Sequence, residues 1–311
     1  MLYGIRNKIK NQKERNQMNL LIDGSSLLWR THYVNISQHK EGASNNIYLF
    51  LKSIKSYADM YGTKNIYVAW DKKLGSESNF RLMETNGEYK GQRNADTAAS
   101  VYECQEELHN ALKLIGCVNI YPWIMEADDI ISWLSKTLDG YNIVITTDSD
   151  MLQLINDNTC VYNPQKKNTI DKNNFTSVMG MPIEHYLAYK AILGDTSDNI
   201  KGIYGCGPVD SKKLAKLWVE TPELVEDEKV ETIKKNIKLM DLSIGYTIGG
   251  EKEVEVYNYQ LDNYEHITAD FENFESFCKK HGFKSILQDM NKWKSTFNSS
   301  VLLDLLLNLP V

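Results

Sequence analysis

Acidic side chains gather at the start of an apolar helical pattern in IMEADDIISWLSK, residues 124–136. Glu126, Asp128 and Asp129 place three carboxylates within four positions. Like charges this close either hold protons at neutral pH or surround a cation. A single acid here would be typical of a helix N-terminus, where a carboxylate caps the helix and favours its dipole. Whether the three form a site depends on which other acids reach the same place.

Three short apolar runs each end at an acid: MNLLIDG (18–24), NIYVAWD (65–71) and YNIVITTDSD (141–150). Each run is typical of a buried strand that stops at a turn. Helical patterns separate them, at roughly 44–60, 97–115 and 126–138. Strands that alternate with helices predict an α/β fold with a mostly parallel central sheet flanked by helices. The ligand crevice of such a sheet lies beyond the carboxyl ends of its strands.

Nine carboxylates are therefore expected to border one crevice. Glu126 and Asp129 share a helix face and Asp128 points away from it, but in the first helical turn all three can reach the crevice. Other acids follow the strands or stand in the turn GDTSDN. Such a group would repel itself unless hard divalent cations neutralise it, which predicts Mg²⁺ or Mn²⁺. The nine are Asp23, Asp71, Glu126, Asp128, Asp129, Asp148, Asp150, Asp195 and Asp198.

Several familiar sites are excluded by spacing. TTDSDML has too few acids for an EF-hand loop and lacks its glycine. GIYGCGPV misses the Lys-Ser/Thr of a P-loop and the third glycine of a dinucleotide fingerprint. No H-E-x-x-H or G-x-S-x-G occurs. A haloacid-dehalogenase-like phosphatase would need an acid two residues after Asp23, where Ser25 stands.

The composition of the 311 residues indicates an ordinary globular protein. Five widely spaced cysteines without a C-x-x-C pair argue against a disulfide framework or a zinc site and favour a reducing, cytoplasmic setting. No apolar run approaches a membrane span, and no targeting is expected. The net charge of −6 is smaller than the charge of the nine acids, so the rest of the chain is net positive and a phosphate partner remains possible. Residues 1–17 are predicted to be a basic tail.

Six motifs, in this order, resemble the structure-specific 5′-nucleases, especially the stand-alone bacteriophage flap endonucleases: LLIDG, VAWD, FRLMETNGEYKGQRN, MEADDII, TTDSDMLQL and LGDTSDNIKGIYGCG. The same family includes the nuclease domain of bacterial DNA polymerase I. The resemblance runs from about Met18 to Leu217. It implies a nuclease core at 18–182 with a helical arch over the active site at about 76–96. It also implies a helical DNA-binding part at 183–311, with a helix-hairpin-helix at about 195–220.

The resemblance also implies roles for the acids. Five of them would hold one metal ion: Asp23, Asp71, Glu126, Asp128 and Asp148. Asp150, Asp195 and Asp198 would complete a second site or hold its ion through water, whereas Asp129 would bridge or act through water. Two such ions would activate the attacking water and steady the leaving oxygen in phosphodiester hydrolysis.

Basic and glycine-rich segments would then contact DNA. Lys90 and Arg93 resemble the catalytic basic pair at the base of the arch and are spaced to reach one phosphate. Tyr89 would stack on an unpaired base, with a packed tyrosine as the alternative; Arg81 is also assigned to DNA binding. GIYGCGP resembles the helix-hairpin-helix, where K⁺ often sits in relatives. Its backbone would approach duplex phosphates at Gly202, Gly205 and Gly207, with Lys212 and Lys213 nearby.

The sequence thus predicts a monomeric, Mg²⁺-dependent 5′ flap endonuclease and 5′-3′ exonuclease of phage-type replication. Its substrates would be DNA with 5′ single-stranded flaps or ends and RNA-primed duplexes. Two rivals stay open. A PIN-like metal-dependent ribonuclease shares the acidic crevice but usually lacks the arch and the helix-hairpin-helix. A catalytically silent DNA-structure binder would use the same surface, although unmatched acids would then be costly.

Overall fold

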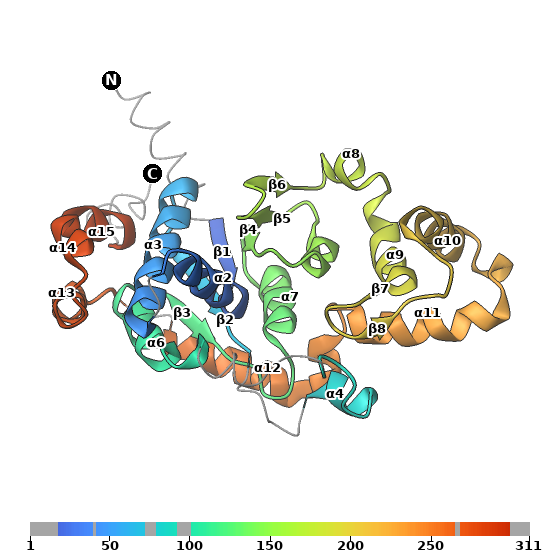
Figure 1. Cartoon of the computed structure of the whole chain (residues 1–311), viewed down its shortest axis with the longest axis horizontal. Helices are drawn as coiled ribbons and strands as arrows, with labels where there is room; N and C mark the ends of the chain where they lie inside the picture. The colour runs from blue at the N-terminus through green and yellow to red at the C-terminus, as the bar shows by residue number, and fades with distance from the viewer. Residues whose placement is uncertain (1–17, 40–41, 72–78, 92–100, 265–267, 299–311) are drawn as a thin grey trace, which may run out of the picture.

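A six-stranded sheet forms the centre of the computed structural model (Figure 1), in the order β3-β2-β1-β4-β5-β6. The structure describes residues 18–39, 42–71, 79–91, 101–264 and 268–298. The first five strands in this order pair in parallel, and β6 joins the edge antiparallel. The strands are β1 (Met18–Asp23), β2 (Asn65–Ala69), β3 (Val118–Ile120), β4 (Tyr141–Ile145), β5 (Thr159–Asn163) and β6 (Asn168–Ile170).

Helices cover both faces of the sheet. Alternate residues of β1 separate two cores: Leu20 and Ile22 face one, and Leu21 faces the other. The first core packs against α2 (Gly24–Ser37), α3 (Ala43–Tyr61) and α6 (Gln105–Leu114). The second packs against α7 (Ala127–Thr137) and the 3₁₀ helix η1 (Asp150–Leu154). The predicted α/β class with a mostly parallel, helix-flanked sheet is confirmed.

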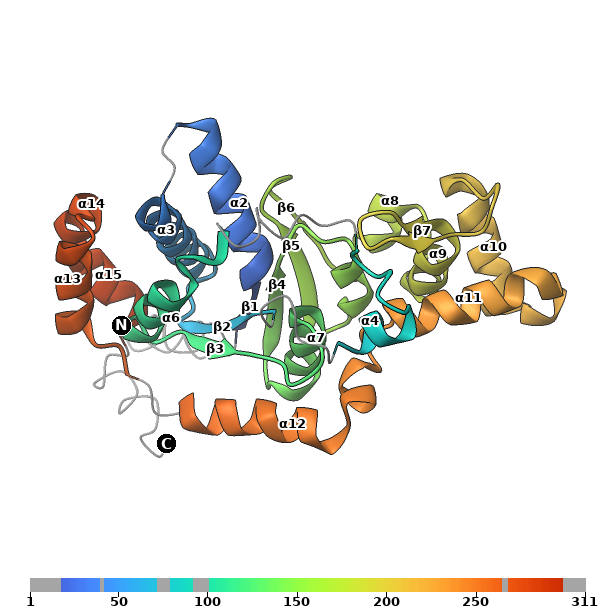
Figure 2. The same cartoon turned by 60° about the horizontal axis from the view of Figure 1, so that its bottom comes forward.

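The C-terminal helices occupy two places (Figure 2). One group surrounds a two-stranded hairpin, and the long α12 runs from it along the sheet to a second group beside α3 and α6. The first group contains α8 (Phe175–Met179), α9 (Tyr186–Leu193), β7 (Gly194–Asp195), β8 (Ile200–Lys201), α10 (Pro208–Glu220) and α11 (Asp227–Met240). The remaining helices are α12 (Gly245–Tyr264), α13 (Phe271–Lys280), α14 (Lys284–Gln288) and α15 (Met290–Phe297).

The predicted arch is described only in part. Its first piece is the short helix α4 (Phe80–Glu84), whose N-cap Asn79 accepts hydrogen bonds from the backbone N–H groups of Arg81 and Leu82. The turn that follows is described as far as Gly91. Arg93, the remainder of the predicted arch and the basic tail 1–17 lie outside the described residues. The helix expected at 97–115 is described as α6 from Gln105.

Gly24 allows the strand β1 to pass directly into α2. A Cβ atom at this position would lie 2.8 Å from Trp70 Cδ2, 2.8 Å from Val68 Cγ1 and 2.9 Å from the carbonyl oxygen of Ala69. The helix therefore starts in close contact with β2. This contact places Asp23, the last residue of β1, at the carboxyl edge of the sheet.

Replacing Gly24 with alanine tests this contact. Because the new methyl group meets backbone and ring atoms that are themselves buried, we expect Gly24→Ala to lower the free energy of unfolding by about 1–3 kcal/mol. Gly207→Ala is the matched control, since no atom lies within 4 Å of a Cβ atom there and φ is −77°. Urea unfolding followed by circular dichroism measures both. Equal stabilities of the two variants would contradict the packing argument.

Candidate metal centre

The predicted crevice lies at the carboxyl edge of the sheet. Asp23 ends β1, Asp71 follows β2 by two residues, and Asp148 follows β4 by three. Because β2 and β4 are both direct neighbours of β1 in parallel, the segments that follow these strands emerge together. The N-terminus of α7 enters the same place, where Asp71 accepts a hydrogen bond from the N–H of Ala127 at 3.0 Å. The acids that follow β1, β2 and β4 therefore lie along the same edge of the sheet.

Burial and mutual repulsion act most clearly on three carboxyl groups of the crevice, those of Asp23, Asp128 and Asp148. Burial favours their neutral forms, and they also repel one another. Burial and the neighbouring Asp71 raise the pKa of Asp23 to about 7, although its carboxylate accepts hydrogen bonds from Ser26 and Thr146. The pKa values of Asp128 and Asp148 are raised by burial and by neighbouring carboxylates. The neighbouring side chains therefore supply too little positive charge to offset the burial and repulsion of these three carboxyl groups.

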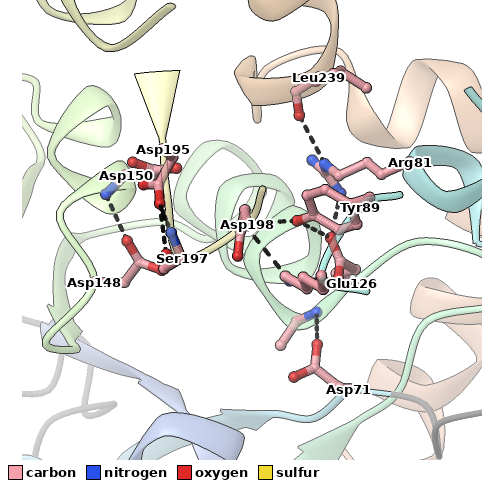
Figure 3. Close-up of polar contacts among 12 residues, drawn as sticks. Asp71, Arg81, Tyr89, Glu126, Asp148, Asp150, Asp195, Ser197, Asp198 and Leu239 are labelled. Carbon is pink, nitrogen blue, oxygen red and sulfur yellow. Dashed lines mark hydrogen bonds and ion pairs between the residues drawn. The ribbon is translucent and has the colours of Figure 1, made fainter. Parts of the chain in front are cut away.

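A second acidic group surrounds Lys190, a residue of α9 that the sequence analysis did not single out. Its Nζ lies 2.8 Å from Asp150 Oδ1 and 2.8 Å from Asp195 Oδ2. Asp195 also accepts hydrogen bonds from Ser197 (Figure 3). Burial and Asp148 raise the pKa of Asp150 to about 6 in spite of the lysine. The sequence gives only a weak signal for this role, namely a lysine inside an apolar helix five residues before Asp195. The contact with Asp150 arises only in the folded chain.

Glu126 lies between three donors. Lys90 Nζ is 2.7 Å from its Oε1, and Arg81 Nη1 and the Tyr89 hydroxyl are 2.9 and 3.0 Å from its Oε2. Burial alone would favour the neutral acid, but Lys90 and Arg81 outweigh it and lower the pKa of Glu126 to about 2. Lys90 Nζ also lies 4.0 Å from Asp198. Glu126 is therefore a charged carboxylate at neutral pH.

Arg81 and Asp129 form a buried ion pair behind the crevice. Arg81 Nη1 and Nη2 donate to the two carboxylate oxygens of Asp129 at 2.7 and 2.9 Å, and Nε donates to the carbonyl oxygen of Leu239 in α11. Arg81 is 4% exposed and Asp129 is fully buried. A Cβ atom at Gly245 would lie 1.9 Å from Asp129 Oδ1, so this glycine covers the pair. In this geometry the donors of Arg81 contact protein, and the expected DNA contact of Arg81 gains no support.

Tyr89 is buried rather than presented for stacking. It is 4% exposed, and its single hydroxyl proton is shared between Glu126 Oε2 at 3.0 Å and Asp198 Oδ2 at 2.9 Å. Its ring packs with Ala191 and Ile200. The packed alternative considered for this tyrosine matches the observed position. Asp198 is thereby brought to Glu126, more than seventy residues away in the chain.

The glycines of the expected helix-hairpin-helix differ in their surroundings. A Cβ atom at Gly202 would lie 2.2 Å from the carbonyl oxygen of Leu193, so Gly202 allows close packing on α9. At Gly205, with φ of +80°, and at Gly207, no atom of the described residues lies within 4 Å of such a position, so the backbone is open there. Lys212 donates to the carbonyl oxygen of Met179 at the end of α8, whereas Lys213 is exposed.

The acidic side chains of the crevice offer carboxylate oxygens, which are the ligands that hard cations prefer. Asp150 Oδ1 is buried and has no aligned hydrogen bond among the described residues. In the described part of the chain, however, no three Asp, Glu, His or Cys side chains converge as a ready-made metal site. Lys90 and Lys190 instead contact the carboxylates. The fold and these acids define an α/β protein with an acidic crevice at the carboxyl edge of its sheet.

Comparisons with known proteins identify the family. A family model described as the 5′-3′ exonuclease N-terminal resolvase-like domain matches residues 18–180. The chain is 31% identical over 201 residues to a 5′-3′ exonuclease of Mycoplasmopsis pulmonis, covering 63% of this chain and 65% of that one. It is 27% identical over 285 residues to a 5′-3′ exonuclease of Buchnera aphidicola, covering 89% and 96%. The chain spans a third of the length of DNA polymerase I from Thermus thermophilus, at 26% identity.

Solved structures agree on the fold. The phage T5 5′-exonuclease with bound zinc matches with a TM-score of 0.63 and 22% identity, over 80% of this chain and 99% of that one. A T5 flap endonuclease complex with DNA and metal ions matches with a TM-score of 0.61. The chain therefore belongs to the 5′-3′ exonuclease family, the metal-dependent nucleases that act on DNA. The prediction of this class is confirmed, and a phage origin stays a prediction.

The buried ion pair yields a stability prediction. Arg81→Met leaves Asp129 buried without its cation, so we expect the free energy of unfolding to fall by about 3–5 kcal/mol. Adding Asp129→Asn removes the unpaired charge, and the double variant should regain part of the loss. Lys238→Met is the control on α11: it breaks an exposed pair with Glu84 of α4 and should change stability by at most about 0.5 kcal/mol. Urea unfolding measures all three, and an Arg81→Met variant as stable as the control would refute the structural role.

Proposed function

We propose that this chain is a 5′ flap endonuclease and 5′-3′ exonuclease that binds two divalent cations, Mg²⁺ or Mn²⁺, in the acidic crevice. The observation that carries the proposal is the convergence of carboxylates from β1, β2, β4, α7 and the β7–β8 turn. When bound, the ions would supply an activated water and a stabilised leaving oxygen. Removal of flaps and RNA primers in replication fits this activity.

The acids divide into two sets. Asp23, Asp71, Glu126, Asp128 and Asp148 would hold one ion, and Asp150, Asp195 and Asp198 would hold the other directly or through water. The raised pKa values of Asp23 and Asp150 support these roles, because both carboxylates are short of positive charge. Asp129 is saturated by Arg81, which supports a role in orienting Glu126 through their shared arginine.

Lys90 would contact the scissile phosphate. Its Nζ borders the crevice on Glu126, and its side chain is 19% exposed, so a phosphate oxygen could replace the carboxylate as its partner. Arg93 is expected to act beside it. In this exchange the ammonium group of Lys90 would leave Glu126, which would then be free to hold metal. The ammonium group would instead stabilise the negative charge that develops on the phosphate.

Duplex DNA would be held at the helix-hairpin-helix. The open backbone at Gly205 and Gly207 supports contacts with phosphates and with a K⁺ ion, and Lys213 is exposed beside it. Gly202 and Lys212 would act indirectly, by packing α9 and α8 beneath the loop. The structure of the T5 flap endonuclease in complex with DNA and metal ions supports a DNA substrate. None of the helices described here is long and apolar enough to cross a membrane.

The first experiment is cleavage of a 5′-flapped duplex that carries a label on the flap end. We expect Mg²⁺ to support release of a short product cut near the junction, and excess EDTA to stop it. A flap that survives in Mg²⁺ and Mn²⁺ while RNA is degraded would establish the PIN-like ribonuclease instead. A fork that is bound and never cut would establish the silent binder.

Variants of the crevice separate chemistry from binding. Asp150→Asn and Asp198→Asn should lower the cleavage rate by about a hundredfold or more, because each removes a ligand charge. Lys90→Ala should lower it by about a hundredfold through the lost phosphate contact. Binding of the flapped duplex, measured in EDTA by fluorescence anisotropy, should change far less. Parallel losses of binding and cleavage would count against the ligand roles.

Lys190 is expected to compete with metal. Because its Nζ lies on Asp150 and Asp195, Lys190→Met should raise the affinity for Mg²⁺ by about tenfold in the absence of DNA. Lys213→Met serves as the control, since it removes an exposed lysine paired with Asp210 outside the crevice. Isothermal titration calorimetry measures both. A lower affinity in Lys190→Met would mean that the lysine organises the carboxylates rather than occupying their site.

A further inference from the structure

The turn between β7 and β8 is fastened to the residues that present Lys90. The Nδ2 amide of Asn199 donates to the carbonyl oxygen of Glu88 at 2.8 Å, and the N–H of Lys90 donates to the carbonyl oxygen of Asp198 at 3.1 Å. The Tyr89 hydroxyl adds a bond to the Asp198 carboxylate. Three consecutive residues of the arch base therefore meet two consecutive residues of the turn. We call residues 88–90 and 198–199 the clamp.

Both sides of the clamp adopt a backbone conformation that needs support. Lys90 has φ of +54° and Asn199 has φ of +59°. The left-handed region is unfavourable for lysine and better tolerated by asparagine. A conformation of this kind persists where surrounding contacts determine it, and such positions are frequent at functional sites. At Lys90 it directs the side chain onto Glu126 while the backbone N–H faces the turn.

The turn itself is rigidly attached to the helices beneath the helix-hairpin-helix. Asn236 of α11 donates to the carbonyl oxygens of Lys201 and Ala191, which joins β8, α9 and α11. The chain then passes from β8 through Gly202 into the open loop and α10. The same short hairpin thus connects the duplex-binding loop to the arch base.

We propose that Asn199 is a positioning residue that sets the reach of Lys90 through the backbone of residues 88–90. It does not touch the substrate; its amide holds Glu88, and the adjoining bond from Lys90 to Asp198 fixes the lysine's backbone. Duplex DNA seated at the helix-hairpin-helix would thereby be held in a fixed relation to the lysine at the scissile phosphate. This inference rests on the proposed nuclease activity and on the role proposed for Lys90.

Two substitutions isolate the amide. Asn199→Asp keeps a residue that tolerates positive φ but replaces the donor with an acceptor that faces the Glu88 carbonyl oxygen. Asn199→Gly relieves the backbone strain entirely and removes the donor. Asn86 provides the matched controls Asn86→Asp and Asn86→Gly. Asn86 lies in the turn that follows α4, has φ of +50° and is exposed.

Cleavage of the flapped duplex in Mg²⁺ is measured under single-turnover conditions, and DNA binding is measured in EDTA. Both Asn199 variants should cleave about five- to tenfold more slowly than wild type, the equivalent of one hydrogen bond, with binding within about twofold. The Asn86 variants should cleave at the wild-type rate. In a Lys90→Ala background, Asn199→Asp should have no further effect, because the two residues act as a unit. The proposal would be overturned if Asn199→Asp lowered the cleavage rate in the Lys90→Ala background as much as it does in the wild type. It would also be overturned if weaker DNA binding accounted for the slower cleavage.

Amide hydrogen exchange of the protein alone provides a readout that does not depend on cleavage. The peptide covering residues 85–91 should exchange faster in Asn199→Asp than in wild type or Asn86→Asp, because the N–H of Lys90 loses its supported partner. Unchanged exchange would refute the clamp. If the wild type failed to cut flapped DNA, the proposed function would fall, whereas the exchange result would still decide whether the clamp exists.

Discussion

Repulsion among carboxylates determines the arrangement at the carboxyl edge of the sheet. Parallel pairing of β1 with β2 and β4 forces Asp23 and the acids that follow the other two strands into one buried place. Burial strengthens the repulsion, because fewer water molecules screen it. The fold therefore requires positive charge at this edge, and the described side chains that supply it come from outside the sheet, from α4, the turn after it and α9.

The three cations differ in how permanently they are bound. The guanidinium of Arg81 is planar, stays charged and satisfies both oxygens of Asp129, so it is suited to a permanent buried contact. Lys90 and Lys190 are point charges on flexible side chains and are more exposed than Arg81. Lysines of this kind can leave when a divalent ion or a phosphate arrives. The arginine is therefore part of the framework, whereas the lysines are the contacts that the proposed metal ions and phosphate would replace.

Local pattern predicted the elements that carry most of the crevice, because β1, β2, β4 and α7 each show a clear apolar period and end or begin at an acid. It missed β3, β5 and β6, of which β3 and β6 have only three residues each. Motif order predicted which acids gather, but not how they are neutralised. The contact of Lys190 with Asp150 and the pairing of Arg81 with Asp129 join residues at least forty positions apart, and no local period reports such contacts.

The position of Arg81 also explains why the base of the arch belongs to the core. Its guanidinium joins α4 to α7 through Asp129 and to α11 through Leu239, and Gly245 at the start of α12 closes over Asp129. Four helices thus meet at one buried charge pair. A buried pair contributes little net stability when it replaces well-packed apolar residues, but removing one partner is costly. Because Arg81 binds Asp129 and Glu126 with the same guanidinium, the pair holds α4 beside the N-terminus of α7, where Lys90 also contacts Glu126.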